Sequence, residues 1–202
     1  MKEEFVTVQN TLEIPSRDAV LDAARSLIAD HGYAGWSMRE LANKSGLAKA
    51  TIYHHFADKQ DIYMSVLERE IALINERTAE AANSPGNAID RLRAVIRTFY
   101  DLQAERHVVF MSAIREMSHN ETQLCNLLRR YRNDLLAPIG QLLDSGVREN
   151  LFRPVNDEMA LVTIFGIMHS FVTHRLLIGD VKTADELVEH TLQMLLNGIG
   201  NH

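Results

Sequence analysis

Apolar side chains recur at intervals of three and four residues along most of the chain. This spacing gathers them on one side of an α-helix. The sequence shows no convincing alternation of apolar and polar residues and no Asn-Gly hairpin turn, so strands are not predicted. The run Ser84-Pro85-Gly86 is the clearest helix breaker. We therefore predict an all-α fold. Helices are expected over residues 16–31, 58–83, 87–104, 121–149, 156–178 and 183–197, with a short apolar one over residues 107–117. Pro138 predicts a kink or a restart near Ala137.

Between residues 37 and 56 the pattern predicts two short helices joined by a tight turn. Ser37 and Glu40 have the spacing of a capping box, in which each side chain bonds a backbone N–H at the start of the first helix. Gly46 ends that helix, because glycine adopts the left-handed conformation that the turn needs. The apolar side of the second helix consists of Leu47, Ile52 and Phe56. This layout predicts a helix-turn-helix whose second helix enters a DNA major groove.

The opposite side of the second helix is polar. Its residues Lys49, Thr51, Tyr53 and His54 can bond phosphates or base edges. An ordinary helical hairpin with a polar face is the alternative interpretation. The preceding helix favours DNA binding, because its apolar stripe and the terminating Gly32 complete a three-helix unit. That stripe contains Val20, Ala24, Leu27 and Ile28.

Three runs resemble the DNA-binding domain of the TetR (tetracycline-repressor-like) regulators. They are Gly32-Tyr33, Ser37-Met38-Arg39-Glu40-Leu41-Ala42 and Ser45-Gly46-Leu47-Ala48-Lys49-Ala50-Thr51-Ile52-Tyr53-His54-His55-Phe56-Ala57-Asp58-Lys59. Trp36, Ser45, Ala48, Ala50 and Gln60 stand where the family usually has Thr, Ala, Ser, Gly and Glu. Ala48 removes a helix cap worth ~1 kcal/mol, and the methyl of Ala50 could touch a thymine methyl. These departures bear on the operator that is read and on the phosphate contact near Trp36.

The resemblance implies a DNA-binding domain over residues 1–59 and a helical regulatory and dimerisation domain over residues 60–202, bridged by the helix over residues 58–83. Our candidates for base-edge contacts are Arg39, Lys49 and Ala50. The candidates for phosphate contacts are Ser37, Thr51, Tyr53, His55 and Lys59. Lys59 is expected near a helix N-terminus, whose N–H groups could join it. His54 could make either contact.

The helix expected over residues 156–178 is apolar nearly all round, which is more than one contact face needs. Burial against its own domain and against a second copy explains this, and Gly166 allows close approach. The candidate interface residues are Leu161, Phe165, Met168, Val172, Leu187, Thr191, Met194 and Leu195. This arrangement resembles the TetR-family dimer, in which two C-terminal helices of each subunit form a four-helix bundle. A buried core helix of a monomer is the alternative.

The middle helices hold aromatic and methionine side chains that would suit a ligand pocket. The candidates are Phe99, Tyr100, Phe110, Met111, Ile114, Met117 and Tyr131. In the resembled family, helices here enclose a pocket whose ligand changes the spacing of the DNA-binding heads, so we expect an apolar or amphipathic effector. For each single residue, plain core is the alternative. The arginines at 91, 93 and 97 and at 129, 130 and 132 could face an anionic ligand such as an acyl-CoA, or lie on solvated faces beside acids.

Charge is uneven along the chain. The whole chain has a net charge of −6, whereas the segment between residues 37 and 59 contains more bases than acids. Its bases are Arg39, Lys44, Lys49 and Lys59, and its acids are Glu40 and Asp58. The acidic remainder should therefore confine DNA contact to this end of the molecule.

Several classes of protein are not expected. The single Cys125 excludes an internal disulfide and fits a reducing cytosol. The N-terminal residues lack the apolar region of a signal peptide, and the apolar stretch over residues 159–172 is too short to span a bilayer. His169 and His174 are five residues apart, which does not place two metal ligands on one helix face, and no catalytic motif is found. We expect a cytoplasmic protein without catalytic residues, metal, cofactor or membrane partner.

These observations predict a homodimeric repressor that binds double-stranded DNA at a palindromic operator. One short recognition helix reads only a few base pairs, so a two-fold dimer is the usual solution. A small molecule in the C-terminal domain would release the operator, with the helix over residues 58–83 as the lever. Two alternatives are a ligand-independent architectural or division-associated DNA-binding protein of the same fold, and a regulator that responds to a partner protein.

Overall fold

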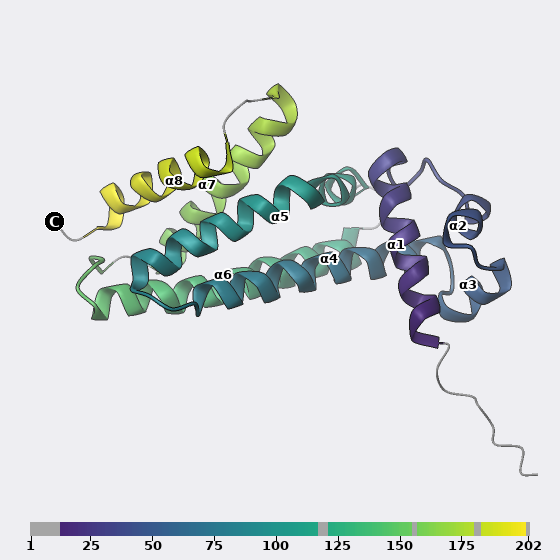
Figure 1. Ribbon diagram of the computed structural model, residues 1–202, viewed down its shortest axis with the longest axis horizontal. Coiled ribbons are helices and arrows are strands. Elements are labelled where there is room, and N and C mark those ends of the chain that lie inside the picture. The colour runs from purple at the N-terminus through teal and green to yellow at the C-terminus, as the bar shows by residue number, and fades with distance from the viewer. Residues whose placement is uncertain (1–12, 117–120, 155–156, 180–182, 201–202) are drawn as a thin grey trace, which may run out of the picture. The chain divides into compact units, whose positions relative to one another are not determined.

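The computed structural model describes residues 13–116, 121–154, 157–179 and 183–200, and these contain eight helices (Figure 1). They are α1 (Glu13–His31), α2 (Met38–Ser45), α3 (Lys49–His55), α4 (Lys59–Ala82), α5 (Ala88–Glu116), α6 (Glu121–Arg148), α7 (Asp157–Ile178) and α8 (Ala184–Ile199). Within these ranges the only extended pairing is an isolated antiparallel bridge between Phe152 and Gly200. The all-α prediction is confirmed.

The chain forms two compact units, and two helices contribute to both of them. The first unit contains α1, α2, α3, the start of α4 as far as Arg69, and the end of α5 from Val108. The second contains the rest of α4 and α5 together with α6, α7 and α8. The boundary expected after residue 59 falls at the start of α4, whereas the units divide ten residues further along that helix.

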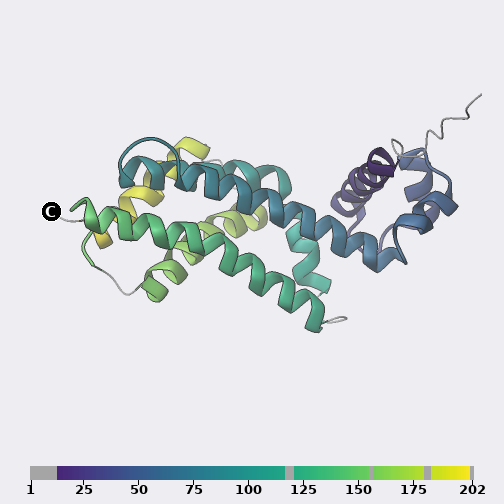
Figure 2. The ribbon, with the colours of Figure 1, turned by 90° about the horizontal axis from the view of Figure 1, so that it is seen from below.

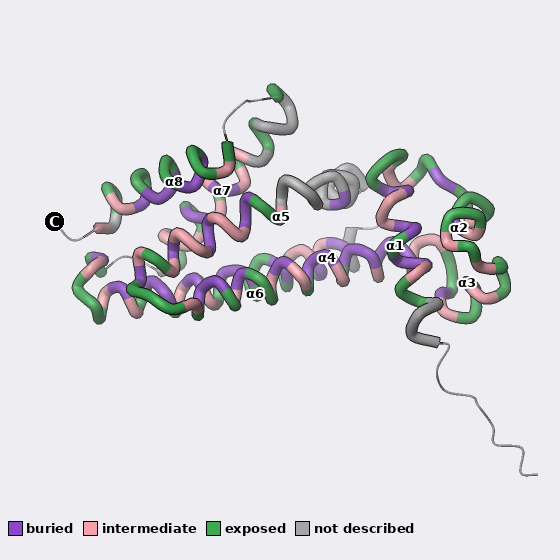
Figure 3. The backbone as a smooth tube through the Cα atoms, in the orientation of Figure 1, coloured by how far each residue is buried: buried purple, intermediate pink, exposed green. Residues whose placement is uncertain are grey.

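The core of the first unit lies between α1 and the pair α2 and α3. The stripe expected on α1 is buried, and Leu41, Ile52 and Phe56 of the helix-turn-helix are buried with it (Figure 3). Burial of these side chains supplies the main stabilisation of the unit. Arg69 ties α4 to α1, because its guanidinium lies 2.7 Å from Asp22 and 3.9 Å from Asp18.

In the second unit, α7 packs against both α6 and α8. The helix α8 also lies along α5, where Arg93 bonds Glu189 at 2.8 Å (Figures 1 and 2). Large side chains that are almost fully buried line the interior: Leu92, Ile96, Phe99, Leu135, Ile139, Leu142, Ile164, Met168, Val188 and Leu192.

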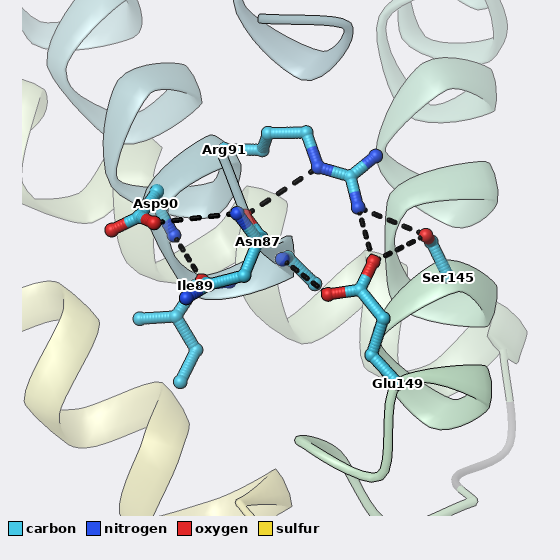
Figure 4. A network of polar contacts seen from close by, with 7 residues as sticks. Asn87, Ile89, Asp90, Arg91, Ser145 and Glu149 are labelled. Atoms are coloured by element: carbon cyan, nitrogen blue, oxygen red, sulfur yellow. Dashed lines mark hydrogen bonds and ion pairs between the residues drawn. The ribbon is translucent and has the colours of Figure 1, made fainter. Parts of the chain in front are cut away.

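The start of α5 is fastened to the end of α6 by a polar network (Figure 4). The carboxylate of Glu149 accepts a hydrogen bond from the backbone N–H of Ala88 at 2.8 Å and pairs with Arg91 at 2.5 Å. The hydroxyl of Ser145 accepts from Arg91 and donates to Glu149, at 2.9 Å and 2.8 Å. The N-terminus of α5 thus receives a negative charge, which its unpaired N–H groups favour.

One predicted helix boundary is wrong. The separate helices expected over residues 87–104 and 107–117 are the single helix α5, and no Gly or Pro lies between them to stop it. Arg106 sits at the expected break and continues the helix while pairing with Glu70 of α4 at 2.6 Å. The helix α6 is one element, as its expected range over residues 121–149 implies, and of the two outcomes expected at Pro138 the restart does not occur. None of the helices described is long and apolar enough to cross a membrane.

Candidate nucleic-acid interface

The local geometry of the helix-turn-helix follows its sequence signals. The N–H of Ser37 donates to the Glu40 carboxylate at 2.8 Å, and the N–H of Glu40 donates to the Ser37 hydroxyl at 3.3 Å. The predicted capping box is therefore confirmed. The hydroxyl and the backbone N–H of Ser37 both donate to the Glu40 carboxylate, and these two bonds lower the pKa of Glu40. Gly46 caps the end of α2 in the left-handed conformation, with φ of 71°, as expected.

The short helix α3 is held by its apolar side. Ile52 is fully buried and Phe56, just past the end of the helix, is nearly so. The guanidinium of Arg17, near the start of α1, lies 5.2 Å from the centroid of the Phe56 ring. No side chain caps the N-terminus of α3, because Ala48 occupies that position in an extended conformation. The burial of one side fixes which side of this short helix faces outward.

The outward side of α3 gathers most of the residues expected to contact DNA. The exposed ones are Lys49, Ala50, Tyr53 and His54, while Thr51 and His55 are half-buried. Arg39 on α2 is exposed as well. The rings of His54 and His55 have centroids 5.4 Å apart. The structure therefore presents donors that suit phosphates and base edges on one short element.

The remaining two candidates, Ser37 and Lys59, are engaged within the unit. The Ser37 hydroxyl donates to the Glu40 carboxylate at 2.8 Å and also accepts from the Glu40 N–H. The ammonium of Lys59 donates to the backbone carbonyl of Trp36 at 2.6 Å and lies over the rings of Tyr33 and Trp36. Helical periodicity gives no signal for the contact of Lys59 with Trp36, because it joins a helix to a loop 23 positions away.

The candidate pocket residues are interior where their side chains are described. Phe99 is fully buried, and Tyr100 and Tyr131 are nearly so. Burial raises the pKa of both tyrosines. The hydroxyl of Tyr100 shares a hydrogen bond with that of Thr191 at 2.8 Å. The remaining candidates, Phe110, Met111, Ile114 and Met117, lie outside the described side chains.

An aromatic cluster with a histidine joins α5 to α7, and periodicity alone did not identify it. The ring of His169 lies between Phe165 and Phe99, with centroid distances of 3.8 Å and 4.9 Å. Its Nδ1 is 3.0 Å from the Phe165 carbonyl oxygen. Burial lowers the pKa of His169, so the neutral imidazole is favoured here.

The candidate interface residues on α7 and α8 differ in exposure. Met168, Leu187, Thr191 and Leu195 are buried within the unit. Leu161 and Phe165 are half-buried, Met194 is 55% exposed, and the side chain of Val172 is not among those described. Among the side chains of α7 that the structure describes, the large apolar ones that are exposed are others, namely Met159, Val162 and Ile178. A Cβ on the exposed Gly166 would meet nothing within 4 Å.

The two candidate groups of arginines are described on α5 and on α6. Arg91 pairs with Glu149, Arg93 with Asp90 and Glu189, and Arg97 with Asp185. The arginines at 91, 93 and 97 therefore agree with the second interpretation, in which they lie on helix faces beside acids and do not face an anionic ligand. Arg129, Arg130 and Arg132 are all exposed on α6. Among the residues that the structure describes, no three His, Cys, Asp or Glu side chains could hold a metal ion.

Two family descriptions match the chain along most of its length. "Bacterial regulatory proteins, tetR family" matches residues 20–66, and "Tetracyclin repressor-like, C-terminal domain" matches residues 85–199, more than half of the chain. The chain belongs to the TetR family of bacterial regulators. It is thus a DNA-binding transcriptional regulator with an N-terminal helix-turn-helix and a C-terminal helical domain.

Curated relatives extend over nearly the whole chain. The fatty acid metabolism regulator protein of Bacillus subtilis is 25% identical over 188 residues, covering 93% of this chain and 97% of that protein. The transcriptional repressor KstR2 of Mycobacterium tuberculosis is 22% identical over 187 residues, covering 91% and 92%.

Solved structures agree with this fold. The fatty acid degradation regulator FadR of Bacillus halodurans has a TM-score of 0.77 and 25% identity, covering 91% of this chain and 96% of that one. FadR of Bacillus subtilis, solved in complex with stearoyl-CoA, also has a TM-score of 0.77, with 24% identity and coverage of 90% and 98%.

Proposed function

We propose that this regulator is a homodimeric repressor that places α3 of each subunit in successive major grooves of a palindromic operator. The outward side of α3 carries this proposal, because Lys49, Tyr53 and His54 are exposed while Ile52 fastens the helix from behind. Arg39, Lys49 and Ala50 would contact base edges. Thr51, Tyr53 and His55 would hold phosphates, and His54 would do either.

Selection of bound fragments from genomic DNA by the purified protein, followed by footprinting, tests this proposal. We expect enrichment of a palindrome whose two protected half-sites are about one helical turn apart or a multiple of it. Protection of a single half-site would contradict the dimeric arrangement. No enrichment even at low salt would contradict the placement of α3 on DNA.

The second copy would pack on the exposed side of α7 and α8. Supporting this, Met159 and Met194 are each more than half exposed, and Val162 lies between them in the chain with 46% exposure. Gly166 follows Val162 by one helical turn and leaves open space for a neighbouring helix. A large contiguous patch of exposed apolar side chains marks an interaction site, whereas single exposed ones are ordinary. The half-buried Leu161 and Phe165 would lie at the edge of this face.

The effector would be an amphipathic molecule with a long apolar chain, of the acyl-CoA class. Two relatives at 25% identity are named as regulators of fatty acid metabolism or degradation, and a neighbour of the same fold was solved with stearoyl-CoA. The interior of the second unit is apolar and aromatic around Phe99 and Tyr100, which suits an acyl chain. Binding would favour the state that does not fit the operator, with a coupling of ~1–3 kcal/mol, and α4 would transmit it.

A titration of the wild-type protein with stearoyl-CoA tests the effector class, with free coenzyme A and stearate as matched controls. We expect a concentration-dependent rise in Tm and release of the selected operator with stearoyl-CoA alone. Operator binding that is indifferent to all three compounds, without any rise in Tm, would favour the ligand-independent alternative.

A further inference from the structure

On the buried side of α4, two polar side chains of the second unit interrupt an apolar stripe. The buried apolar members of the stripe in this unit are Ile71, Ile74, Ala81 and Ala82. Thr78 lies in the middle of the stripe and is 1% exposed. Asn75, three residues earlier, lies at its edge, and its Oδ1 is buried. Residues three apart on a helix are neighbours on its surface, so the two polar groups lie side by side.

These two polar groups lack the bonds that buried groups normally make. Among the residues that the structure describes, neither Thr78 Oγ1 nor Asn75 Oδ1 has a hydrogen-bond partner. A threonine inside a helix can donate to the carbonyl four residues back. Thr163 and Thr173 of α7 do so, at 2.8 Å and 2.9 Å, whereas the hydroxyl of Thr78 does not. A buried polar group without a partner is costly, so this pair calls for an explanation.

The pair offers a ligand one donor and one acceptor. The Thr78 hydroxyl can donate, and the side-chain oxygen of Asn75 accepts. The matching group has a carbonyl oxygen and an N–H close together, which is the chemistry of a secondary amide. We propose that Asn75 and Thr78 bind an amide group of the effector. The amide N–H donates to Asn75 Oδ1, and the Thr78 hydroxyl donates to the amide carbonyl.

This inference deepens the proposed effector class and rests on it. The arm of coenzyme A next to the thioester contains amide groups, so an acyl-CoA can satisfy the pair while its chain lies among apolar side chains. A free fatty acid cannot, because an ionised carboxylate has no donor. A hydroxyl group on the acyl chain is the other source of a donor and an acceptor in one place, so a hydroxylated probe is part of the test.

Thioesters of stearic acid that differ at a single group test the inference. The amide probe is the N-acetylcysteamine thioester, which places an amide near the sulfur as coenzyme A does. The ester probe has an oxygen in place of the N–H and keeps the carbonyl, and the S-pentyl thioester lacks both groups. We expect the wild type to bind the amide probe most tightly, the ester probe less tightly and the pentyl thioester least tightly.

Substitutions assign each hydrogen bond to its residue. Thr78→Val, which keeps the shape of the side chain, should raise the Kd of the amide and ester probes roughly tenfold, because both use the carbonyl. Asn75→Leu should raise the Kd of the amide probe alone, because only that probe has the N–H. Thr78→Ser retains the hydroxyl and should bind each probe much as the wild type does.

The free protein provides a readout that needs no ligand. Replacing an unbonded buried hydroxyl by a methyl group removes a desolvation cost, so Thr78→Val should keep or raise the Tm. The matched control is Thr191→Val. The Thr191 hydroxyl is buried and shares a hydrogen bond with that of Tyr100 at 2.8 Å, so this substitution should lower the Tm.

Any of four results would overturn the inference: no preference of the wild type for the amide probe over the pentyl thioester, an equal effect of Thr78→Val on all three probes, unchanged binding of the amide probe by Asn75→Leu, or a loss of Tm in Thr78→Val as large as in Thr191→Val. Tighter binding of the S-pentyl thioester of 3-hydroxystearic acid than of the amide probe would also overturn it, because the pair would then recognise a hydroxyl.

Failure of the proposed effector class has a different pattern. A wild type that responds to stearoyl-CoA but shows one of these results retains the effector class and loses the amide assignment. A wild type that responds neither to stearoyl-CoA nor to any probe contradicts both.

Discussion

At the scale of single residues, Glu149 serves two helices with one carboxylate. It accepts from the N–H of Ala88 at the start of α5 and pairs with Arg91 and Ser145. The pKa of Glu149 is lowered first by the bond from Ala88, then by the bond from Ser145 and by the charge of Arg91. The folded protein therefore favours the ionised carboxylate more than the unfolded chain does. The stability of the junction between α5 and α6 thus depends on pH.

Glu149→Gln is expected to lower the Tm at neutral pH. A carboxylate whose pKa is lowered on folding stabilises the protein above its ordinary value, here 4.5, and this stabilisation is lost as the pH falls through the folded value. The Tm values of the variant and the wild type should therefore converge as the pH is lowered below the ordinary value. The exposed Glu80→Gln serves as control. A Tm difference that is the same at neutral and acid pH would contradict this role of the ionised carboxylate.

Two exposed residues of α3 should differ in what they contribute to DNA recognition. Tyr53→Ala should weaken binding to all sequences alike, because a phosphate contact carries no sequence information. Lys49→Ala should instead relax the preference at particular base pairs, each worth about 1–3 kcal/mol. Repeating the fragment selection with both variants measures this. Unchanged operator affinity in both would show that α3 does not face the groove as we propose.

At the scale of helices, α3 lacks a side-chain cap at its N-terminus. Ala48 has φ of −66° and ψ of 145°, the extended conformation that a capping serine adopts. Ala48→Ser should therefore stabilise the helix-turn-helix by about 0.5–1 kcal/mol, measured as a rise in the midpoint of urea unfolding. Ala48→Val, which offers no acceptor oxygen, is the matched control. Equal effects of both substitutions would rule out capping as the cause.

The ion pair between α4 and α5 should matter far more than the pairs on the surface. Glu70 is 1% exposed and its partner Arg106 is 22% exposed. Arg106→Met leaves the Glu70 charge inside without its arginine partner, which costs about 3–5 kcal/mol for buried pairs. Arg93→Met, at an exposed pair, should cost less than about 1 kcal/mol. Urea unfolding compares the two, and similar losses would contradict the role assigned to burial.

The features that the sequence predicted well are formed by residues close together in the chain. The cap of α2 joins Ser37 to Glu40, and Gly46 ends the helix by its own conformation, so both follow from local physics. The contact of Lys59 with Trp36 joins a loop to a helix across intervening elements, and helical periodicity contains no information about such distances.

The sequence also could not predict which side of α7 is buried and which is exposed. This helix is apolar nearly all round, so its pattern could not distinguish Met168, which points into the unit, from Met159, which is 63% exposed. The break expected near Arg106 fails for a related reason. A polar residue there reads as the end of a helix face, whereas it is the partner of a buried acid on another helix.

At the scale of the whole molecule, Val162→Arg should separate the subunits. An arginine in the middle of the proposed interface would bring two charges together across the two-fold axis, where neither has a partner. Sedimentation should then report a monomer, and operator affinity should fall because one α3 reads only half of the site. The control Gln141→Arg adds the same charge at an exposed position of α6. A Val162→Arg protein that remains dimeric would place the interface elsewhere.

The division into units has a practical consequence for building hybrid regulators. The first unit is not one continuous stretch of sequence, since it ends at Arg69 and resumes at Val108. Val109 in this second stretch is only 1% exposed, so its side chain is part of the interior. A chimera joined at a single crossover in α4 would combine one parent's DNA-reading helices with the other parent's end of α5. Transfer of operator specificity from this chain to a relative therefore requires a graft of two separated stretches, the second being Val108 to Glu116.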